Sequence, residues 1–149
     1  MNGATADRNT RFSDQDYRDI LAFRNQLRRF LAWSEMQCRA AGLTPSQHQL
    51  LLAVRGHPSA EAPTIGQIAE HLQLRHHSAV GLIDRAEAAG LIRRVHDRND
   101  RRIVRIALEP MGEEALEELT ALHITELAVL ADASAAFRRA RPADGVTED

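Results

Sequence analysis

The chain lacks several features that would define common protein classes. It contains no lysine, so all 19 of its basic residues are arginine. It has a single cysteine, Cys38, which excludes an intramolecular disulfide and is typical of a reducing compartment. No apolar run approaches the roughly 20 residues that cross a bilayer, and the first twelve residues contain no apolar segment of a secretory signal. We therefore expect a cytoplasmic protein with no membrane partner.

Enzyme motifs are also missing. The sequence has no G-x-S-x-G elbow, no H-E-x-x-H motif, no P-loop and no dinucleotide fingerprint. His96, Asp97 and Asp100 lie close together in the sequence, but the tip of a hairpin offers no water-excluding pocket for acid–base chemistry. We therefore expect neither catalysis nor a bound cofactor.

The charged residues are unevenly distributed along the chain. With 149 residues, of which 44% are hydrophobic, the chain can form one globular domain with its own core. Its formal net charge is −2. However, residues 91–105 contain six arginines and two aspartates, whereas residues 109–126 contain six glutamates and no arginine. A basic patch on a nearly neutral chain favours an anionic partner.

Apolar residues at three- and four-residue steps predict a long first helix over residues 13–41, which ends at Gly42. We expect the flanking residues 1–12 to be disordered. After Pro110 a last helical region presents leucines on one broad side and glutamates on the other. We expect it to consist of short helices, followed by a polar tail over residues 141–149.

Two capping boxes mark the starts of short helices in the middle of the chain. Thr44 is followed three residues later by Gln47, and Thr64 is followed in the same way by Gln67. A further helix is expected over residues 75–89, with Gly90 just beyond its end.

A change of period after Gly90 predicts a β-hairpin. Residues 91–96 and 102–108 alternate in the manner of half-buried strands, and the turn formers Asp-Arg-Asn-Asp separate them at 97–100. A hairpin that follows three short helices is the order of a winged helix-turn-helix. A helix of about 15 residues is roughly 22 Å long and can lie in the DNA major groove.

Several stretches, taken in order, resemble the MarR family of bacterial transcriptional regulators. They are LTPSQHQLL at 43–51, TIGQIAEHLQL at 64–74, LIDRAEAAGLIRR at 82–94, DRNDRR at 97–102 and IALEPMG at 106–112. The resemblance covers about residues 13–130. Its most specific part is G-L-I-R-R followed by D-R-N-D-R-R and an apolar strand.

The resemblance implies a fold and an assembly. The fold is mainly α with a small antiparallel β-hairpin, an α+β winged helix-turn-helix in one integrated domain. A dimerisation helix over 13–42 and C-terminal dimerisation helices over 109–140 would flank a DNA-binding region over 43–108. The expected protein is a homodimer in the bacterial cytoplasm, associated with the nucleoid.

The resemblance also assigns a DNA-contacting role to individual residues. In the wing, Arg102 would enter the minor groove, Asp100 would brace it, and Arg98 and Arg101 would bind phosphates. The recognition-helix candidates are Arg75, His76, His77, Ser78, Gly81 and Arg85. The family's usual S-x-S-T-V-T-R run is replaced here by R-H-H-S-A-V-G, so base specificity does not transfer from relatives.

The implied function is a sequence-specific repressor of an inverted-repeat operator in double-stranded DNA, released by a small aromatic or phenolic ligand. Phe30, Trp33 and Met36 are the candidates for the ligand pocket. Two other functions stay open: a winged-helix module that binds RNA or an acidic protein, and a metal-responsive regulator.

Histidines and the cysteine also have simpler interpretations. His76 and His77 point about 100° apart on a helix and rarely share one ion, so we expect no metal site. Cys38 would lie near the end of the first helix, where the helix dipole disfavours a thiolate, so we expect an unreactive thiol. The other histidines are expected at the surface or the edge of the core: His48, His57, His71, His96 and His123.

Overall fold

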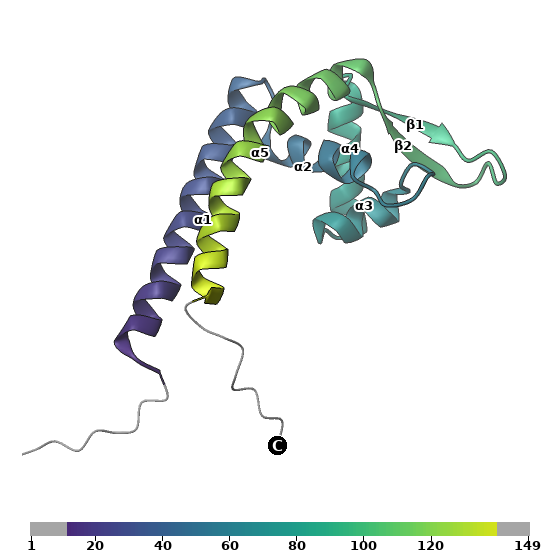
Figure 1. The fold of residues 1–149 in the computed structure, drawn as a ribbon. Coiled ribbons are helices and arrows are strands. Elements are labelled where there is room, and N and C mark those ends of the chain that lie inside the picture. The colour runs from purple at the N-terminus through teal and green to yellow at the C-terminus, as the bar shows by residue number, and fades with distance from the viewer. Residues whose placement is uncertain (1–11, 140–149) are drawn as a thin grey trace, which may run out of the picture. The chain divides into compact units, whose positions relative to one another are not determined.

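A computed structural model describes residues 12–139 (Figure 1). The elements, in chain order, are α1 (Asp14–Ala40), α2 (Pro45–Arg55), α3 (Ile65–Leu72), α4 (His76–Ala88), β1 (Ile92–His96), β2 (Val104–Leu108) and α5 (Pro110–Arg139). This order confirms the expected class, mainly α with one antiparallel hairpin. The expectations for residues 1–11 and for the polar tail at 141–149 lie outside the described residues. In the part of the chain that is described, no helix has the length and apolar character needed to cross a membrane.

The chain divides into two compact units. One unit, called the helical unit below, combines the chain up to residue 32 with the chain from residue 125 onward. The other, called the winged-helix unit, comprises residues 33–124. The division runs through α1 and α5, whereas the sequence placed its boundaries at the ends of these helices, within one integrated domain.

The predicted helix boundaries rest on local capping chemistry. Thr44 and Thr64 accept hydrogen bonds from the backbone N–H groups of Gln47 and Gln67, whose side chains bond back to the caps, so both capping boxes are confirmed. Gly90, just beyond α4, has a φ of 74°, a left-handed conformation that costs glycine little. By contrast, Arg75 at the start of α4 makes no side-chain capping bond.

The C-terminal region is a single helix of 30 residues, Pro110–Arg139. The expectation of several short helices was therefore wrong. Residues 113–139 contain no glycine and no proline, and they are rich in alanine, leucine and glutamate, which favour uninterrupted helix. The regular composition of this stretch could have revealed the long helix.

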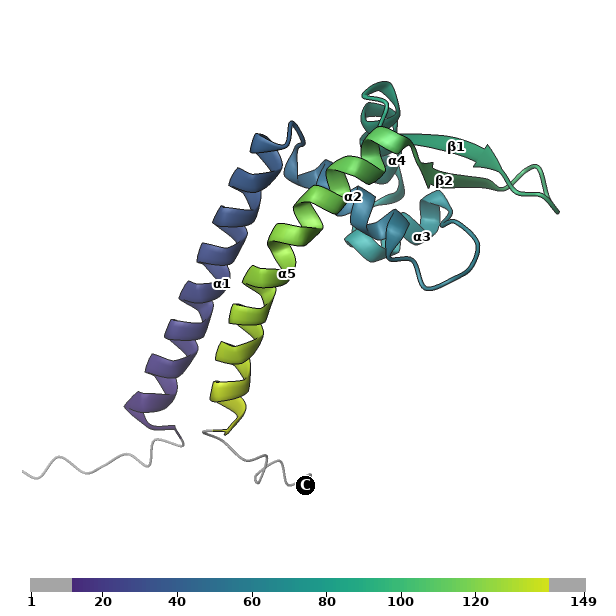
Figure 2. The same ribbon diagram turned by 45° about the horizontal axis from the view of Figure 1, so that its top comes forward.

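A buried core joins the hairpin to the helices of the winged-helix unit. β1 and β2 pair antiparallel, with Ile92 opposite Leu108. Ile92 and Ile106 are almost fully buried and pack in the same core as Leu50, Leu51, Ile68 and Ile83. The N–H of Ile106 also donates to the carbonyl of Pro63 at 2.8 Å, which ties β2 to the loop before α3. The turn of the hairpin projects beyond the helices of this unit (Figure 2).

Candidate nucleic-acid interface

The tip of the hairpin presents one arginine in a fixed and exposed position. The Nε and Nη2 groups of Arg102 donate to the two carboxylate oxygens of Asp100, each at 3.0 Å. The backbone N–H of Arg102 donates to the same carboxylate at 3.0 Å. These bonds lower the pKa of Asp100, with the Arg102 side chain as the largest cause. The Arg102 side chain is nevertheless 91% exposed. The pair therefore has the geometry of a brace that leaves the cation open to solvent.

Asp97 organises the turn from inside. Its carboxylate accepts the backbone N–H groups of Asn99 at 2.8 Å and Asp100 at 3.0 Å. It also accepts the Nε of Arg105 at 2.6 Å. Together these bonds, with that of Arg105 the largest cause, lower the pKa of Asp97 to about 2. Asp97 thus shapes the turn as a hydrogen-bond acceptor rather than only neutralising the arginines beside it.

Arg105 connects this turn to the loop before α3. Besides Asp97, it donates through Nη1 to the carbonyl of Ala62 at 2.8 Å and through Nη2 to Glu61 at 2.7 Å. Its side chain is only 17% exposed. Because one guanidinium binds three acceptors on two segments, the turn and the loop before α3, the position of the wing depends on it.

Arg94 connects β1 to α4 in a similar way. Its Nη2 lies 2.6 Å from Asp84, and its Nη1 lies 2.8 Å from Glu87. Asp84 contributes most to raising the pKa of Arg94. Arg93 donates to the carbonyl of Leu108 at 2.8 Å.

The six arginines of residues 91–105 therefore fall into two groups. Arg93, Arg94 and Arg105 bond to residues outside the turn. Arg98, Arg101 and Arg102 are exposed at the tip, where Arg102 bonds to Asp100 of the same turn. The sequence-based prediction took all six as one basic patch. It did not include carboxylate partners such as Glu61, which lies 44 residues from Arg105. Within the hairpin, the candidate interface is therefore limited to the tip. The exposed residues of α4 complete it.

α4 exposes most of the predicted recognition residues. Ala79, Leu82, Ile83 and Ala86 are buried on one face of the helix. Of the six predicted recognition residues, Gly81 is half-buried. The other five are exposed: Arg75, His76, His77, Ser78 and Arg85. A Cβ at Gly81 would meet only the Nη1 of Arg85, at 3.4 Å. Packing against a neighbouring helix therefore does not explain this glycine.

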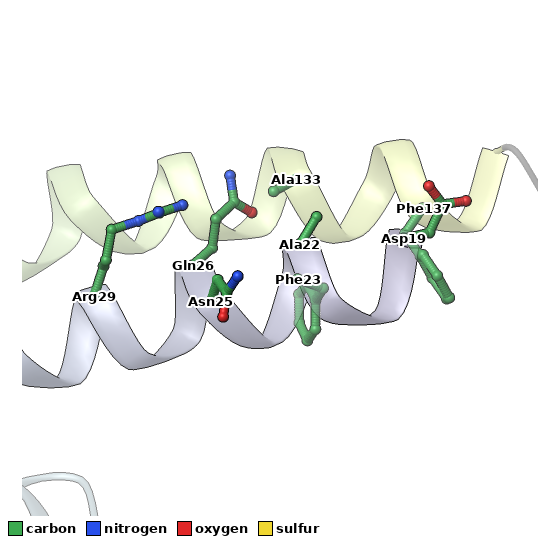
Figure 3. A pocket seen from close by; sticks show the side chains of 8 residues that line it. All are labelled: Asp19, Ala22, Phe23, Asn25, Gln26, Arg29, Ala133 and Phe137. Carbon is green, nitrogen blue, oxygen red and sulfur yellow. The ribbon is translucent and has the colours of Figure 1, made fainter. Parts of the chain in front are cut away.

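The three residues predicted for a ligand pocket are divided between the two units. Phe30 is half-buried in the helical unit, Met36 is 59% exposed in the winged-helix unit, and the Trp33 ring packs on His123 with centroids 5.0 Å apart. The helical unit instead contains a pocket of about 570 Å³ that none of the three lines (Figure 3). In this pocket the rings of Phe23 and Phe137 lie 6.5 Å apart.

Two of the remaining histidines contradict the sequence-based expectation. His48 is 2% exposed and His123 is 8% exposed, so both belong to the core of the winged-helix unit and not to the surface or core edge. Cys38 is buried in the same unit, and burial is the largest cause that raises the pKa of its thiol. This supports the prediction of an unreactive thiol. Among residues 12–139, no group of three or more histidine, cysteine or acidic side chains could hold a metal ion.

Three helices followed by a hairpin, with a buried face on the third helix and arginines at the hairpin tip, define a winged helix-turn-helix protein. Residues 41–103 match the sequence model of the MarR family. In this region the chain is similar to the MarR family.

Individual relatives agree with this assignment. The HTH-type transcriptional repressor MdtR of Bacillus subtilis (strain 168) is 31% identical over 80 residues, which cover 54% of this chain and 50% of MdtR. The chain thus spans about half the length of this curated relative. The MarR family transcription regulator SP03579 has a similar structure, with a TM-score of 0.69 and 26% identity over 86% of each chain. The DNA complex of Staphylococcus aureus MepR gives a TM-score of 0.63 and 21% identity over 81% of this chain and 84% of MepR.

Proposed function

We propose that the chain is a dimeric transcriptional regulator that binds an inverted-repeat operator in double-stranded DNA and represses the genes that follow it. The observation that carries the proposal is the exposed Arg102, held by Asp100 at the tip of the hairpin, together with an exposed first turn of α4 in the same unit. The similarity to the repressor MdtR over 80 residues and the structural likeness to DNA-bound MepR support it.

α4 would read the major groove. Its 13 residues correspond to a rod of roughly 20 Å, and the major groove is about 12 Å wide. In helix-turn-helix proteins the first residues of the recognition helix contact base edges. Here these residues are His76, His77 and Ser78, preceded by Arg75, and all four are exposed. Gly81 and Arg85 follow one and two turns further along.

Arg102 would read the minor groove with the part of its guanidinium that Asp100 leaves free. A guanidinium has five N–H donors, and the bonds to Asp100 occupy Nε and one hydrogen of Nη2. Three N–H donors remain for acceptors on the DNA, where a narrow minor groove concentrates negative potential. Asp100 fixes the orientation of Arg102 in advance, which reduces the conformational entropy lost on binding. Arg98 and Arg101 would bind the flanking phosphates.

Selection of duplexes from random DNA by the full-length chain tests the proposal, and it is expected to enrich a palindrome. On that duplex, Arg102→Ala should weaken binding by about 1–3 kcal/mol, or roughly 5- to 150-fold, because a minor-groove contact is lost. Fluorescence anisotropy at several salt concentrations measures both the affinity and its salt slope. Arg101→Ala should lower the slope by about 0.9, as expected for one phosphate contact.

Arg55→Ala is the matched control. Arg55 is an exposed arginine of the same unit, but it is the last residue of α2 and belongs neither to the hairpin nor to α4. Its affinity should stay at the wild-type value. An unchanged dissociation constant for Arg102→Ala would remove the wing from the mechanism. If no duplex is enriched even at low salt, the alternative of an RNA or acidic protein partner is favoured instead.

The surface of the helical unit supports a homodimer. A monomer would leave many large apolar side chains of this unit in water. On α5 these are Leu127 and Val129, and on α1 they are Tyr17, Ile20, Leu21, Leu27 and Leu31. Exposed apolar patches of this kind mark interaction surfaces. A two-fold dimer would place two recognition helices one DNA turn apart, roughly 34–36 Å.

Leu21→Glu combined with Leu31→Glu should convert the dimer into a monomer, since it places two charges on this apolar face. Light scattering should show half the mass, and affinity for the palindrome should fall about a hundredfold because the two half-sites are no longer bound together. Met111→Glu, at an apolar residue equally exposed on the winged-helix unit, should keep the dimer. A double variant that retains the dimeric mass would contradict this interface.

Release from DNA by a small aromatic or phenolic ligand completes the proposal and rests on the family resemblance. Such a ligand would act by favouring a dimer whose recognition helices no longer match the operator spacing. Phe30, Trp33 and Met36 remain the predicted contacts.

A further inference from the structure

Two imidazole rings are buried against each other inside the winged-helix unit. His48 comes from α2 and His123 from α5, and their ring centroids lie 4.8 Å apart. The end of α1 completes the cluster: the Trp33 ring lies 5.0 Å from the His123 ring, and the Ser34 hydroxyl lies 2.7 Å from His123 Nε2. The cluster therefore joins α2, which packs on α3 and α4, to parts of α1 and α5.

His123 keeps its hydrogen bonds in either protonation state. Its Nδ1 lies 2.7 Å from the carbonyl oxygen of Leu119, which can only accept, so Nδ1 carries a hydrogen. In the neutral ring, Nε2 accepts from the Ser34 hydroxyl. In the protonated ring, Nε2 donates to the same hydroxyl oxygen. A proton on His123 therefore breaks no bond of its own, but it places a charge beside His48.

His48 has no such support. Neither of its ring nitrogens has a hydrogen-bond partner within the described residues. Burial first, and then the charge of His123, lower the pKa of His48 to about 4. Among the described residues, no charge other than that of His123 shifts the pKa of His48. On the adjoining part of α1, Cys38 is buried, and Glu35 and Arg39 are exposed and pair with each other at 3.4 Å.

We propose that His48, buried against His123, forms a proton-sensitive lock that holds α2 against the adjoining parts of α1 and α5 while the His48 ring is neutral and releases it in mildly acidic solution. The physical reason is that α2 must move to hydrate a His48 cation, since its buried site offers no acceptor. The lock does not depend on DNA binding. Its effect on operator affinity does rest on the proposed function, because α2 supports α3 and α4.

The direction of the pH dependence follows from the pKa. The pKa of His48 falls from 6.5 to about 4 on folding, so the packed form is fully favoured above pH 6.5 and loses stability as the pH falls from 6.5 toward 4. At pH 5 the two-state linkage relation gives a shift of up to about 30-fold in the packing equilibrium. The loss continues below pH 5 and levels off once the pH is under the folded pKa.

Amide hydrogen exchange of the full chain at pH 7.5 and 5.0 tests the lock. After correction for intrinsic exchange rates, exchange in α2 of the wild type should rise by up to about 30-fold at pH 5.0. His48→Leu fills a similar volume without a titrating group, so its corrected exchange should not change with pH. His71→Gln removes a histidine outside the cluster and should behave like the wild type. If the leucine variant fails to fold, His48→Met takes its place.

A wild type whose α2 exchange does not respond to pH would overturn the lock, and so would an equal response in wild type and His48→Leu. DNA affinity provides the second readout, on the duplex selected above. The wild type should lose more affinity than His48→Leu between pH 7.5 and 5.0, because the two proteins differ only at residue 48. If no duplex is enriched, the proposed function fails, but the exchange result still decides the lock.

Discussion

Arg105→Met is expected to lower the free energy of unfolding of the winged-helix unit by about 1–3 kcal/mol, the usual effect of leaving hydrogen-bond acceptors without their donor. Arg105 is 17% exposed and binds the Asp97 carboxylate, whose side chain is 7% exposed. It also binds the carbonyl of Ala62 and the carboxylate of Glu61. Methionine fills the volume but leaves these acceptors without a donor, so the wing loses its attachment to the loop before α3.

Urea unfolding measures this loss. Arg101→Met removes the same charge from an exposed position of the same turn, so its unfolding free energy should stay within about 0.5 kcal/mol of the wild type. Arg105→Lys keeps the charge, but one amino group cannot reproduce a planar guanidinium that binds three acceptors on two segments, so an intermediate value is expected. A loss below about 1 kcal/mol for Arg105→Met would mean that the wing is positioned mainly by its apolar contacts.

The same variant should also change the acid dependence of stability. The pKa of Asp97 is lowered from 3.8 to about 2, so its contribution is fully present above pH 3.8 and is lost as the pH falls toward 2. Because the bond from Arg105 is the largest cause of this shift, unfolding of Arg105→Met should depend less on pH in that range.

Local sequence signals predicted the elements, but not how the charged residues pair. The capping boxes at Thr44 and Thr64 and the glycine after α4 act within four residues of the boundary they set, so they can be recognised without a structure. The partners of Arg94 lie 7 and 10 residues away, on α4. Which arginines remain free for DNA therefore depends on tertiary contacts, and a net charge summed over a segment cannot separate them.

The buried histidines show a different limit. His48 precedes the buried Leu51 by three residues, and His123 follows the buried Leu119 by four. Helical spacing therefore placed both on apolar faces. The polar character of histidine suggested the surface instead. A neutral imidazole, however, carries no charge and can be buried among other side chains. Spacing was the more reliable signal here than residue type.

Gly112→Ala is expected to destabilise the winged-helix unit by about 3 kcal/mol, at the upper end for overpacking because the obstacle is backbone. Gly112 lies in the first turn of α5, and a Cβ there would clash with the carbonyl oxygen of Leu91 and stand 3.3 Å from Cδ2 of Leu51. The Leu91 carbonyl already accepts the N–H of Glu109 at 3.0 Å. Alanine must therefore push α5 away from the start of β1.

Gly66→Ala is the matched control, because it makes the same change near the start of α3. A Cβ at Gly66 would meet only the Thr64 hydroxyl, at 3.9 Å, so the gain in helix propensity, up to about 1 kcal/mol, should appear without strain. The free energy of unfolding, measured in urea, should thus fall for Gly112→Ala and rise for Gly66→Ala. If Gly112→Ala is also stabilising, α5 can shift without loss, and its close approach to β1 does not set the position of the hairpin.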